Sequence, residues 1–133
     1  MIPSKLARQG GAGGELVYIM HLPCWSKCVV SINVLGGSQP QTHHKTAILA
    51  LNNRSSTLIC YRMCESPTVD TMEIYYDIDA NSKDMNIYVR NPYEYPLAQC
   101  CLMNDEEVSY PGFVFNVQES STQISSLYQA TIL

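Results

Sequence analysis

Short runs of apolar and β-branched residues recur along the chain, and each run is closed by residues that favour turns. In residues 71–78 and 85–90, apolar residues alternate with polar or aromatic ones. Successive side chains of a β-strand point to opposite faces of the sheet, so this period of two predicts strands with one dry face and one wet face. We expect strands at residues 16–21, 28–35, 46–52, 56–63, 71–78, 85–90, 97–103 and 112–118, and a ninth near 124–132.

The spacing of these runs predicts the fold class. Pro92, Pro96 and Pro111 fall between the runs, as expected of residues that cannot donate to a central β-ladder. No stretch has the apolar period and the caps of a helix. We therefore predict an all-β protein, an antiparallel β-sandwich or jelly-roll-like domain of about eight strands.

Length and glycine content suggest the domain organisation. The 133 residues are enough for one domain with a core. Four glycines within residues 10–14 disfavour any regular element, because glycine loses the most backbone entropy on folding. We expect a flexible Gly-rich arm or linker over residues 1–14 and a single antiparallel β-domain over residues 15–133.

Charged residues make up only 15% of the chain, well below the roughly 25% that is usual in soluble domains. A surface so poor in charge favours coverage by protein partners. With a net charge of −4 and no basic cluster, nucleic-acid binding through this domain has no support. No apolar run reaches the roughly 18 residues of a membrane-spanning helix, so we expect no membrane partner.

Six cysteines form three close pairs, and their chemical state stays open at this stage. Neighbours such as Cys100 and Cys101 point to opposite faces of a strand, so any disulfide would link different strands. Buried thiols in a reducing compartment are the reading we favour. The alternatives are inter-strand disulfides and a zinc site built from Cys24, Cys28, Cys60 and Cys64.

One stretch resembles a cation-binding loop. Asp77, Asp79 and Asn81 stand at alternate positions, as in the opening of an EF-hand calcium loop. The match then fails, because Ser82 stands where that loop requires glycine. A hairpin turn with side-chain to backbone hydrogen bonds explains the same residues. We predict no metal and no cofactor, with calcium at these three residues as the alternative.

Catalytic candidates are weak. His21 or His44 could in principle act as a base for a nucleophile, but no sequence motif fixes such a pairing. The candidate nucleophiles are Cys24, Ser26 and Ser38. We therefore predict that the protein is not an enzyme.

Tyrosines and two turn regions are the candidate contact residues. The chain has nine tyrosines against two phenylalanines, and tyrosine is favoured in recognition surfaces. Asn53–Arg54–Ser55 is also a glycosylation sequon at a predicted hairpin tip. We predict a binding surface and two exposed loop tips: Tyr75, Tyr88, Tyr93, Tyr95 and Arg90 for the surface, and Asn53, Arg54, Asn81 and Lys83 for the tips.

The low charge, the Ser, Thr, Asn and Gln content, the Tyr-rich strands and the Gly-rich entry together resemble a capsid or surface β-domain of a picorna-like RNA virus. The resemblance implies a structural or attachment domain of the virion or an extracellular surface. Its expected partners are other copies, other capsid subunits, and a host receptor or glycan. The alternative is a secreted or surface carbohydrate-binding β-sandwich module, assisted by calcium.

Overall fold

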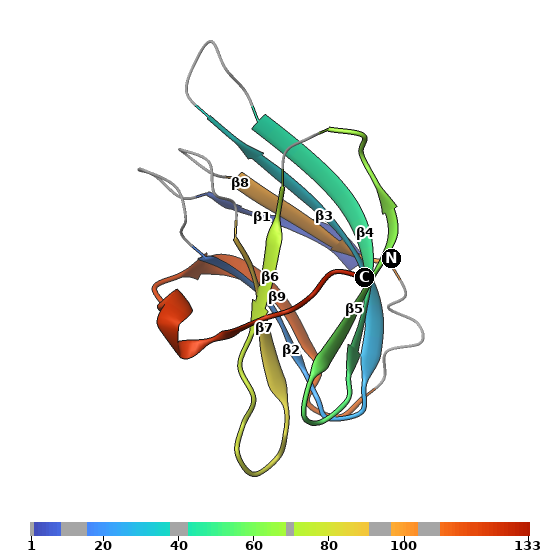
Figure 1. The fold of residues 1–133 in the computed structure, drawn as a ribbon, viewed down its shortest axis with the longest axis vertical. Coiled ribbons are helices and arrows are strands. Elements are labelled where there is room, and N and C mark those ends of the chain that lie inside the picture. The colour runs from blue at the N-terminus through green and yellow to red at the C-terminus, as the bar shows by residue number, and fades with distance from the viewer. Residues whose placement is uncertain (1, 9–15, 38–42, 69–70, 91–96, 104–109) are drawn as a thin grey trace.

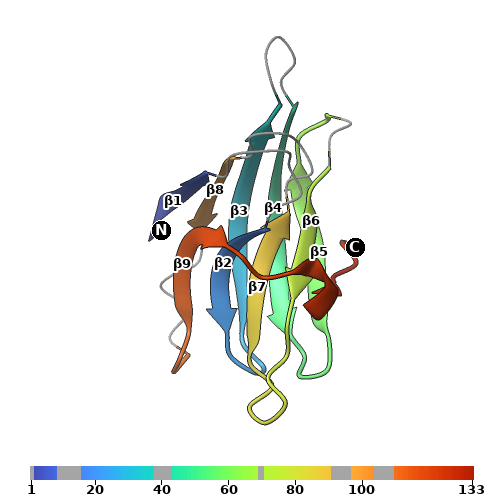
Figure 2. The same ribbon diagram turned by 90° about the vertical axis from the view of Figure 1, so that its left-hand side faces the viewer.

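A computed structural model of the chain describes residues 2–8, 16–37, 43–68, 71–90, 97–103 and 110–133. It is a sandwich of two antiparallel sheets, each with five strands (Figures 1 and 2). The strands are β1 (Ile2–Arg8), β2 (Leu16–Leu22), β3 (Lys27–Gly36), β4 (His43–Asn53), β5 (Leu58–Glu65), β6 (Glu73–Tyr76), β7 (Met85–Arg90), β8 (Leu97–Leu102), β9 (Val114–Ser120) and β10 (Tyr128–Gln129).

Sheet A has the strand order β1-β8-β3-β4-β5, and sheet B has the order β10-β6-β7-β2-β9. The predicted antiparallel β-sandwich is therefore confirmed. Each of the eight predicted strands corresponds to one strand, from β2 to β9. The ninth predicted strand is instead the 3-10 helix η2 (Ile124–Ser126) followed by the two-residue strand β10.

The start of the chain differs from the prediction. Ile2–Arg8 were expected in a flexible arm, but they form β1, which pairs with β8 at the edge of sheet A. Without β1, the outer edge of β8 would present a row of unpaired backbone groups, and that row gives a short segment a partner despite the glycines that follow. The rest of the predicted arm, residues 9–14, lies outside the described residues.

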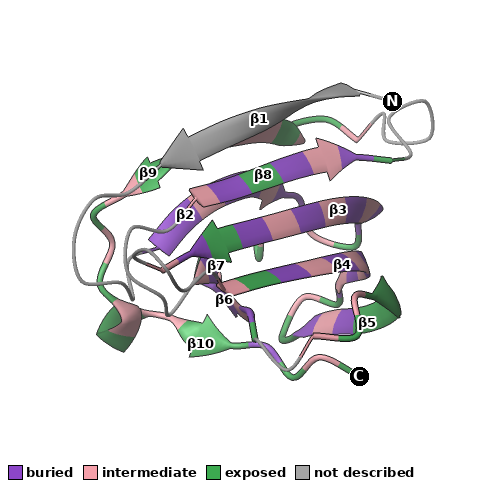
Figure 3. Ribbon diagram, turned by 90° about the horizontal axis from the view of Figure 1, so that it is seen from above, coloured by how far each residue is buried: buried purple, intermediate pink, exposed green. Residues whose placement is uncertain are grey.

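The core lies between the sheets and follows the predicted alternation. Ile74, Met85, Ile87 and Val89 are fully buried, so the predicted dry face of residues 71–90 is confirmed. In sheet A, β3, β4 and β8 show the same alternation along their length (Figure 3).

A register shift between Tyr18 and Met20 breaks this alternation in β2. Ile19 and Met20 are both fully buried, which strict alternation would forbid. Because of the shift, His21 faces outward on the same side of sheet B as Tyr18, where it pairs with Asn86 of β7.

The segment after β9 holds the two sheets together at one side. It passes across the outer face of sheet B (Figure 2), and β10 pairs with β6. It then reaches sheet A, where Ile132 forms a parallel bridge with Cys60 and the Leu133 N–H donates to the Cys60 carbonyl at 2.9 Å. We call residues 128–133 the clasp.

Candidate functional site

Three turns meet at one end of the sandwich: residues 23–26 between β2 and β3, residues 54–57 between β4 and β5, and residues 77–84 between β6 and β7. They lie at the lower end in Figure 1, and we call them the loop end. Each contains one non-glycine residue with positive φ, namely Trp25 (67°), Ser55 (74°) and Lys83 (63°). Such backbone is unfavourable for residues with a Cβ atom, so something must hold each turn in place.

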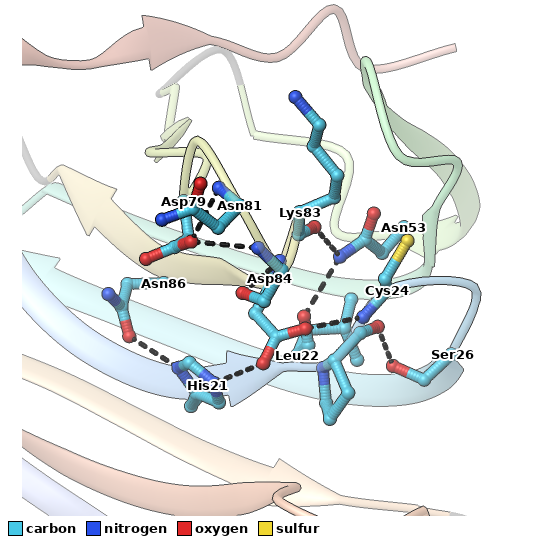
Figure 4. Close-up of polar contacts among 12 residues, drawn as sticks. His21, Leu22, Cys24, Ser26, Asn53, Asp79, Asn81, Lys83, Asp84 and Asn86 are labelled. Carbon is cyan, nitrogen blue, oxygen red and sulfur yellow. Dashed lines mark hydrogen bonds and ion pairs between the residues drawn. The ribbon is translucent and has the colours of Figure 1, made fainter.

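Asn53 ties the three turns together (Figure 4). Its Nδ2 donates to the carbonyls of Leu22 at 2.9 Å and Lys83 at 3.0 Å, while its Oδ1 accepts from the Ser55 N–H. Its backbone exchanges hydrogen bonds with Trp25 and Ser26. Asn53 is 0% exposed, so the prediction that it forms an exposed loop tip is wrong.

Burial of Asn53 also affects the glycosylation sequon Asn53–Arg54–Ser55. The Asn53 Nδ2 would be the acceptor atom for a glycan, yet it is buried and hydrogen-bonded to two carbonyls. An asparagine fits this position because one buried amide can form three hydrogen bonds and so join three turns. Arg54, Asn81 and Lys83 are exposed, as predicted for loop tips.

His21 joins β2 to the β6–β7 hairpin (Figure 4). Its Nδ1 lies 3.0 Å from Asn86 Oδ1, and its Nε2 lies 3.1 Å from Asp84 Oδ2. Burial disfavours the charged imidazolium, but these hydrogen bonds and the Asp84 charge outweigh it and raise the pKa of His21. Asp84 Oδ1 also accepts from the Cys24 N–H, so one carboxylate links two turns.

The hairpin itself accounts for the residues of the predicted calcium loop. Asp79 Oδ1 accepts the N–H groups of Asn81 and Ser82, and these bonds lower the pKa of Asp79. Both oxygens of Asp77 accept from Asn86. The two carboxylates therefore serve as acceptors within the hairpin, which is the turn explanation considered above. Within the described residues, no group of three or more His, Cys, Asp and Glu side chains is placed to hold a metal ion.

Trp25 is the most exposed large apolar side chain of the described residues, at 62%. The guanidinium carbon of Arg54 lies 5.5 Å from the centre of its ring, within the range of a cation–π contact. Sequence reasoning missed this residue. The available signal was the only tryptophan of the chain standing in a turn, next to Pro23 and Cys24, and not in a strand.

Two tyrosines of the predicted binding surface are buried in the structure. Tyr75 and Tyr88 pair across β6 and β7, but they are 6% and 7% exposed because Ile124 and Leu127 pack over them. The prediction that they form a contact surface is therefore wrong. Arg90 forms an ion pair with Glu73 on the same face. Tyr93 and Tyr95 lie outside the described residues.

The outer face of sheet A has a different character. Cross-strand rows place Val29, Ala50 and Tyr61 side by side, and a second row holds Ser31, Ile48 and Cys64. No Lys, Arg, Asp or Glu side chain lies between these rows in the described part of the sheet. Tyr61 is 56% exposed. We call the outward residues in the middle of β3, β4, β5 and β8, together with Met103 just after β8, the uncharged face: Val29, Ser31, Asn33, Leu35, Thr46, Ile48, Ala50, Asn52, Ile59, Tyr61, Cys64, Leu97, Gln99, Cys101 and Met103. Lys27, opposite Asn52 at the start of β3, and His44, opposite Leu35, lie outward at its two margins.

The six cysteines are thiols in this structure. Burial raises the pKa of Cys28, Cys60 and Cys100 to about 12, which keeps them protonated and unreactive. Cys28 and Cys60 lie in the core, whereas Cys64 is exposed, so the four thiols considered for zinc do not share one environment. Cys28, Cys60 and Cys100 are therefore buried thiols, as the sequence-based interpretation expected.

Of the catalytic candidates, Ser26 and His21 form hydrogen bonds that hold turns, and Cys24 is half-buried in the turn between β2 and β3. The Ser26 hydroxyl is buried and donates to the Pro23 carbonyl. His21 contacts Asn86 and Asp84, while His44 stands at the start of β4, away from the loop end. Ser38 lies outside the described residues.

A pocket of about 230 Å³ opens beside β5, between the two sheets. Its polar lining comes from Lys45, Arg62 and Glu65. The Lys45 ammonium donates to the carbonyls of Ser66 and Thr68 and pairs with Glu65 at 3.3 Å. Arg62 also pairs with Glu65. Because these charged groups bond to one another and to the backbone of Ser66 and Thr68, they hold the segment after β5 in place.

Within the described residues, none of the helical structure is long and apolar enough to cross a membrane.

Comparisons with known proteins add little to this picture. No family model and no curated protein matches the chain, so the picorna-like resemblance gains no support. Among solved structures, the chain is similar to the tailspike protein of an Acinetobacter phage, with a TM-score of 0.42 and 10% sequence identity. The match covers 88% of this chain and 22% of the tailspike protein. A similarity at this level does not extend to function.

Proposed function

We propose that this chain is a non-enzymatic structural or attachment domain of a virus particle, which assembles with other copies of itself through the uncharged face of sheet A. The low charge and the Ser, Thr, Asn and Gln content of the sequence support the viral setting. The loop end, at one end of the sandwich, stays accessible in such an assembly.

The uncharged face is the observation that carries this proposal. Burying a charge in an interface removes its hydration, which is unfavourable. A surface without charges therefore has a small desolvation penalty when a partner covers it. The core of protein interfaces is correspondingly depleted of Lys, Glu and Asp and enriched in Tyr and Met. Tyr61 and Met103 stand exposed at opposite sides of this face, with Ala50 and Val29 between them.

The candidate nucleophiles support the non-enzymatic part. The Ser26 hydroxyl is buried in a turn, and three of the six thiols are held protonated by burial. His21 supports two turns by contacts to Asn86 and Asp84.

The test places one positive charge on each outer face. Ile48→Lys puts a charge at the centre of the uncharged face, and Gln118→Lys puts the same charge on an exposed position of β9 in sheet B. We expect light scattering to give a mass of several copies for the wild type and Gln118→Lys, and of one copy for Ile48→Lys. Circular dichroism should show the same β content in all three.

A second readout uses the thiol on the same face. Cys64 should react slowly with a thiol reagent in the assembled wild type and quickly in Ile48→Lys, because a neighbouring copy would cover it. A wild type that stays monomeric over the accessible concentration range, with Cys64 reacting fast, would overturn the proposal.

A further inference from the structure

We infer that Trp25 and Arg54, at the loop end, form a binding site for a saccharide that carries a carboxylate group. The inference deepens the attachment part of the proposed function. It concerns a different surface from the uncharged face, so the two proposals can fail separately.

Trp25 is unfavourable for the fold in two respects. It occupies the third position of a turn closed by the Ser26 N–H and the Pro23 carbonyl at 3.0 Å, with φ at 67°. That backbone favours glycine, because any Cβ atom crowds the neighbouring carbonyl. The ring is also mostly exposed, so its burial offsets little of the free energy lost to the unfavourable backbone conformation. A residue that is strained and exposed together indicates a role outside folding.

The turn presents the ring rigidly. The Trp25 N–H donates to the Asn53 carbonyl at 3.0 Å, and the Asn53 N–H donates to the Ser26 carbonyl at 2.9 Å. Ser26 and Asn53 are both fully buried. Because the backbone around Trp25 is already fixed, a ligand that binds the ring loses little affinity to ordering of the loop.

The loop end carries exposed cations beside carboxylates that are used within the turns, of which Asp77 and Asp84 are half-buried and Asp79 is exposed. Asp77, Asp79 and Asp84 accept hydrogen bonds from groups of the chain itself. Arg54 and Lys83 are exposed, and within the described residues neither forms an ion pair. The Arg54 guanidinium lies over one face of the Trp25 ring, so a cation and an aromatic surface stand together at the loop end.

This combination fits an acidic sugar. The face of an indole ring is electronegative and attracts the C–H groups of a sugar ring. A guanidinium beside it binds a carboxylate through two parallel hydrogen bonds. The exposed neighbours are small and polar, namely Ser56, Thr57, Asn81 and Ser82, and they offer hydrogen bonds to sugar hydroxyls. A stable protein partner would instead cover about 800 Å² of this surface, far more than one ring and one guanidinium provide.

Trp25 is the only tryptophan of the chain, so its fluorescence reports this site alone. The probes are sialyllactose and digalacturonic acid, with lactose as the neutral match of the first, followed by an array of acidic and neutral glycans. We expect saturable fluorescence changes with acidic sugars, and binding of lactose that is weaker by at least about tenfold because the charge-assisted pair is lost.

The variants separate binding from folding. Trp25→Gly should abolish binding measured by calorimetry while keeping or raising the melting temperature, because glycine relieves the positive φ. Arg54→Gln should weaken acidic sugars to the level of neutral ones. Gln118→Lys adds a positive charge elsewhere and should bind like the wild type.

Two results would overturn the inference: no acidic glycan that distinguishes the wild type from Trp25→Gly, or equal binding of acidic and neutral sugars. The Ile48→Lys variant should bind each sugar with the affinity of the wild type per site. A wild type that assembles but binds no glycan would leave the proposed function standing and the saccharide site refuted.

Discussion

The two outer faces of the sandwich are built in opposite ways. Sheet B carries aromatic and charged residues, and residues 124–127 of the same chain lie over Tyr75 and Tyr88. Sheet A carries uncharged outward residues across the middle of β3, β4, β5 and β8, with Lys27 at the margin, and no segment of the described chain lies over Tyr61. The outer face of sheet B, which the sequence predicts to be exposed to solvent, is thus partly covered by residues 124–127.

This difference shows that side-chain polarity alone does not identify a free surface. A tyrosine offers a large apolar ring, so a covering segment with Ile124 and Leu127 gains more by packing on Tyr75 and Tyr88 than on a row of serines. The phenol groups keep polar contacts at the rim, as the Tyr75 hydroxyl does with Glu73. Burial next to Tyr88 and Asp77 likewise raises the pKa of Tyr18 to about 12.

The largest expected effect comes from one tyrosine on each face. Tyr88→Ala should lower the free energy of unfolding by about 3 kcal/mol, because it leaves a cavity under the covering segment. Tyr61→Ala should change it by less than about 0.5 kcal/mol. Urea denaturation in the Ile48→Lys background measures both in the monomer. Equal losses from the two variants would contradict the contrast between the faces.

A smaller effect is expected from the cover itself. Leu127→Ser should lower the free energy of unfolding by about 1 kcal/mol, since Leu127 is only half-buried. It should also expose Tyr75 and Tyr88, which the second-derivative ultraviolet spectrum detects. The exposed neighbour Ser125 provides the control, and Ser125→Ala should leave both the stability and the spectrum unchanged.

The smallest effect concerns the loop end, where His21 faces Asn86, Asp84, Asp77 and Tyr18. Its pKa is raised in the folded state, so folding is favoured by the protonated form. This stabilisation is complete below the ordinary histidine pKa of about 6.5 and is lost as the pH rises through the higher folded value.

The urea midpoint of the wild type should therefore fall as the pH rises through this window. His21→Gln should remove most of the fall, because glutamine keeps a hydrogen-bond donor without the titrating charge. The prediction fails if both proteins show the same pH profile between about pH 6 and pH 8.

The strands could be predicted from the sequence because burial alternates along them. The dry face of residues 71–90 is a local pattern, and local patterns survive in the structure. The pairing of β1 with β8 could not be predicted, since it depends on a sheet edge formed by residues far along the chain. The register shift in β2 was equally hidden, although it decides that His21 faces outward.

The site was harder to predict for a related reason. Asn53 looks like a turn residue in the sequence, and only the meeting of three turns makes it a buried connector. Arg54 and Lys83 were predicted as exposed tips because charge at a turn is a local property. Trp25 is exposed in a turn with a positive φ, and no sequence rule assigns a positive φ to tryptophan.

The clasp also covers part of an open sheet edge. An unpaired strand at the side of a sheet is a template on which another chain can continue the β-ladder without end. At β5, the carbonyl of Cys60 and the N–H of Arg62 already bond to Leu133 of the same chain. Another chain therefore cannot extend sheet A at this part of β5, which protects the folded protein there from open-ended fibre growth.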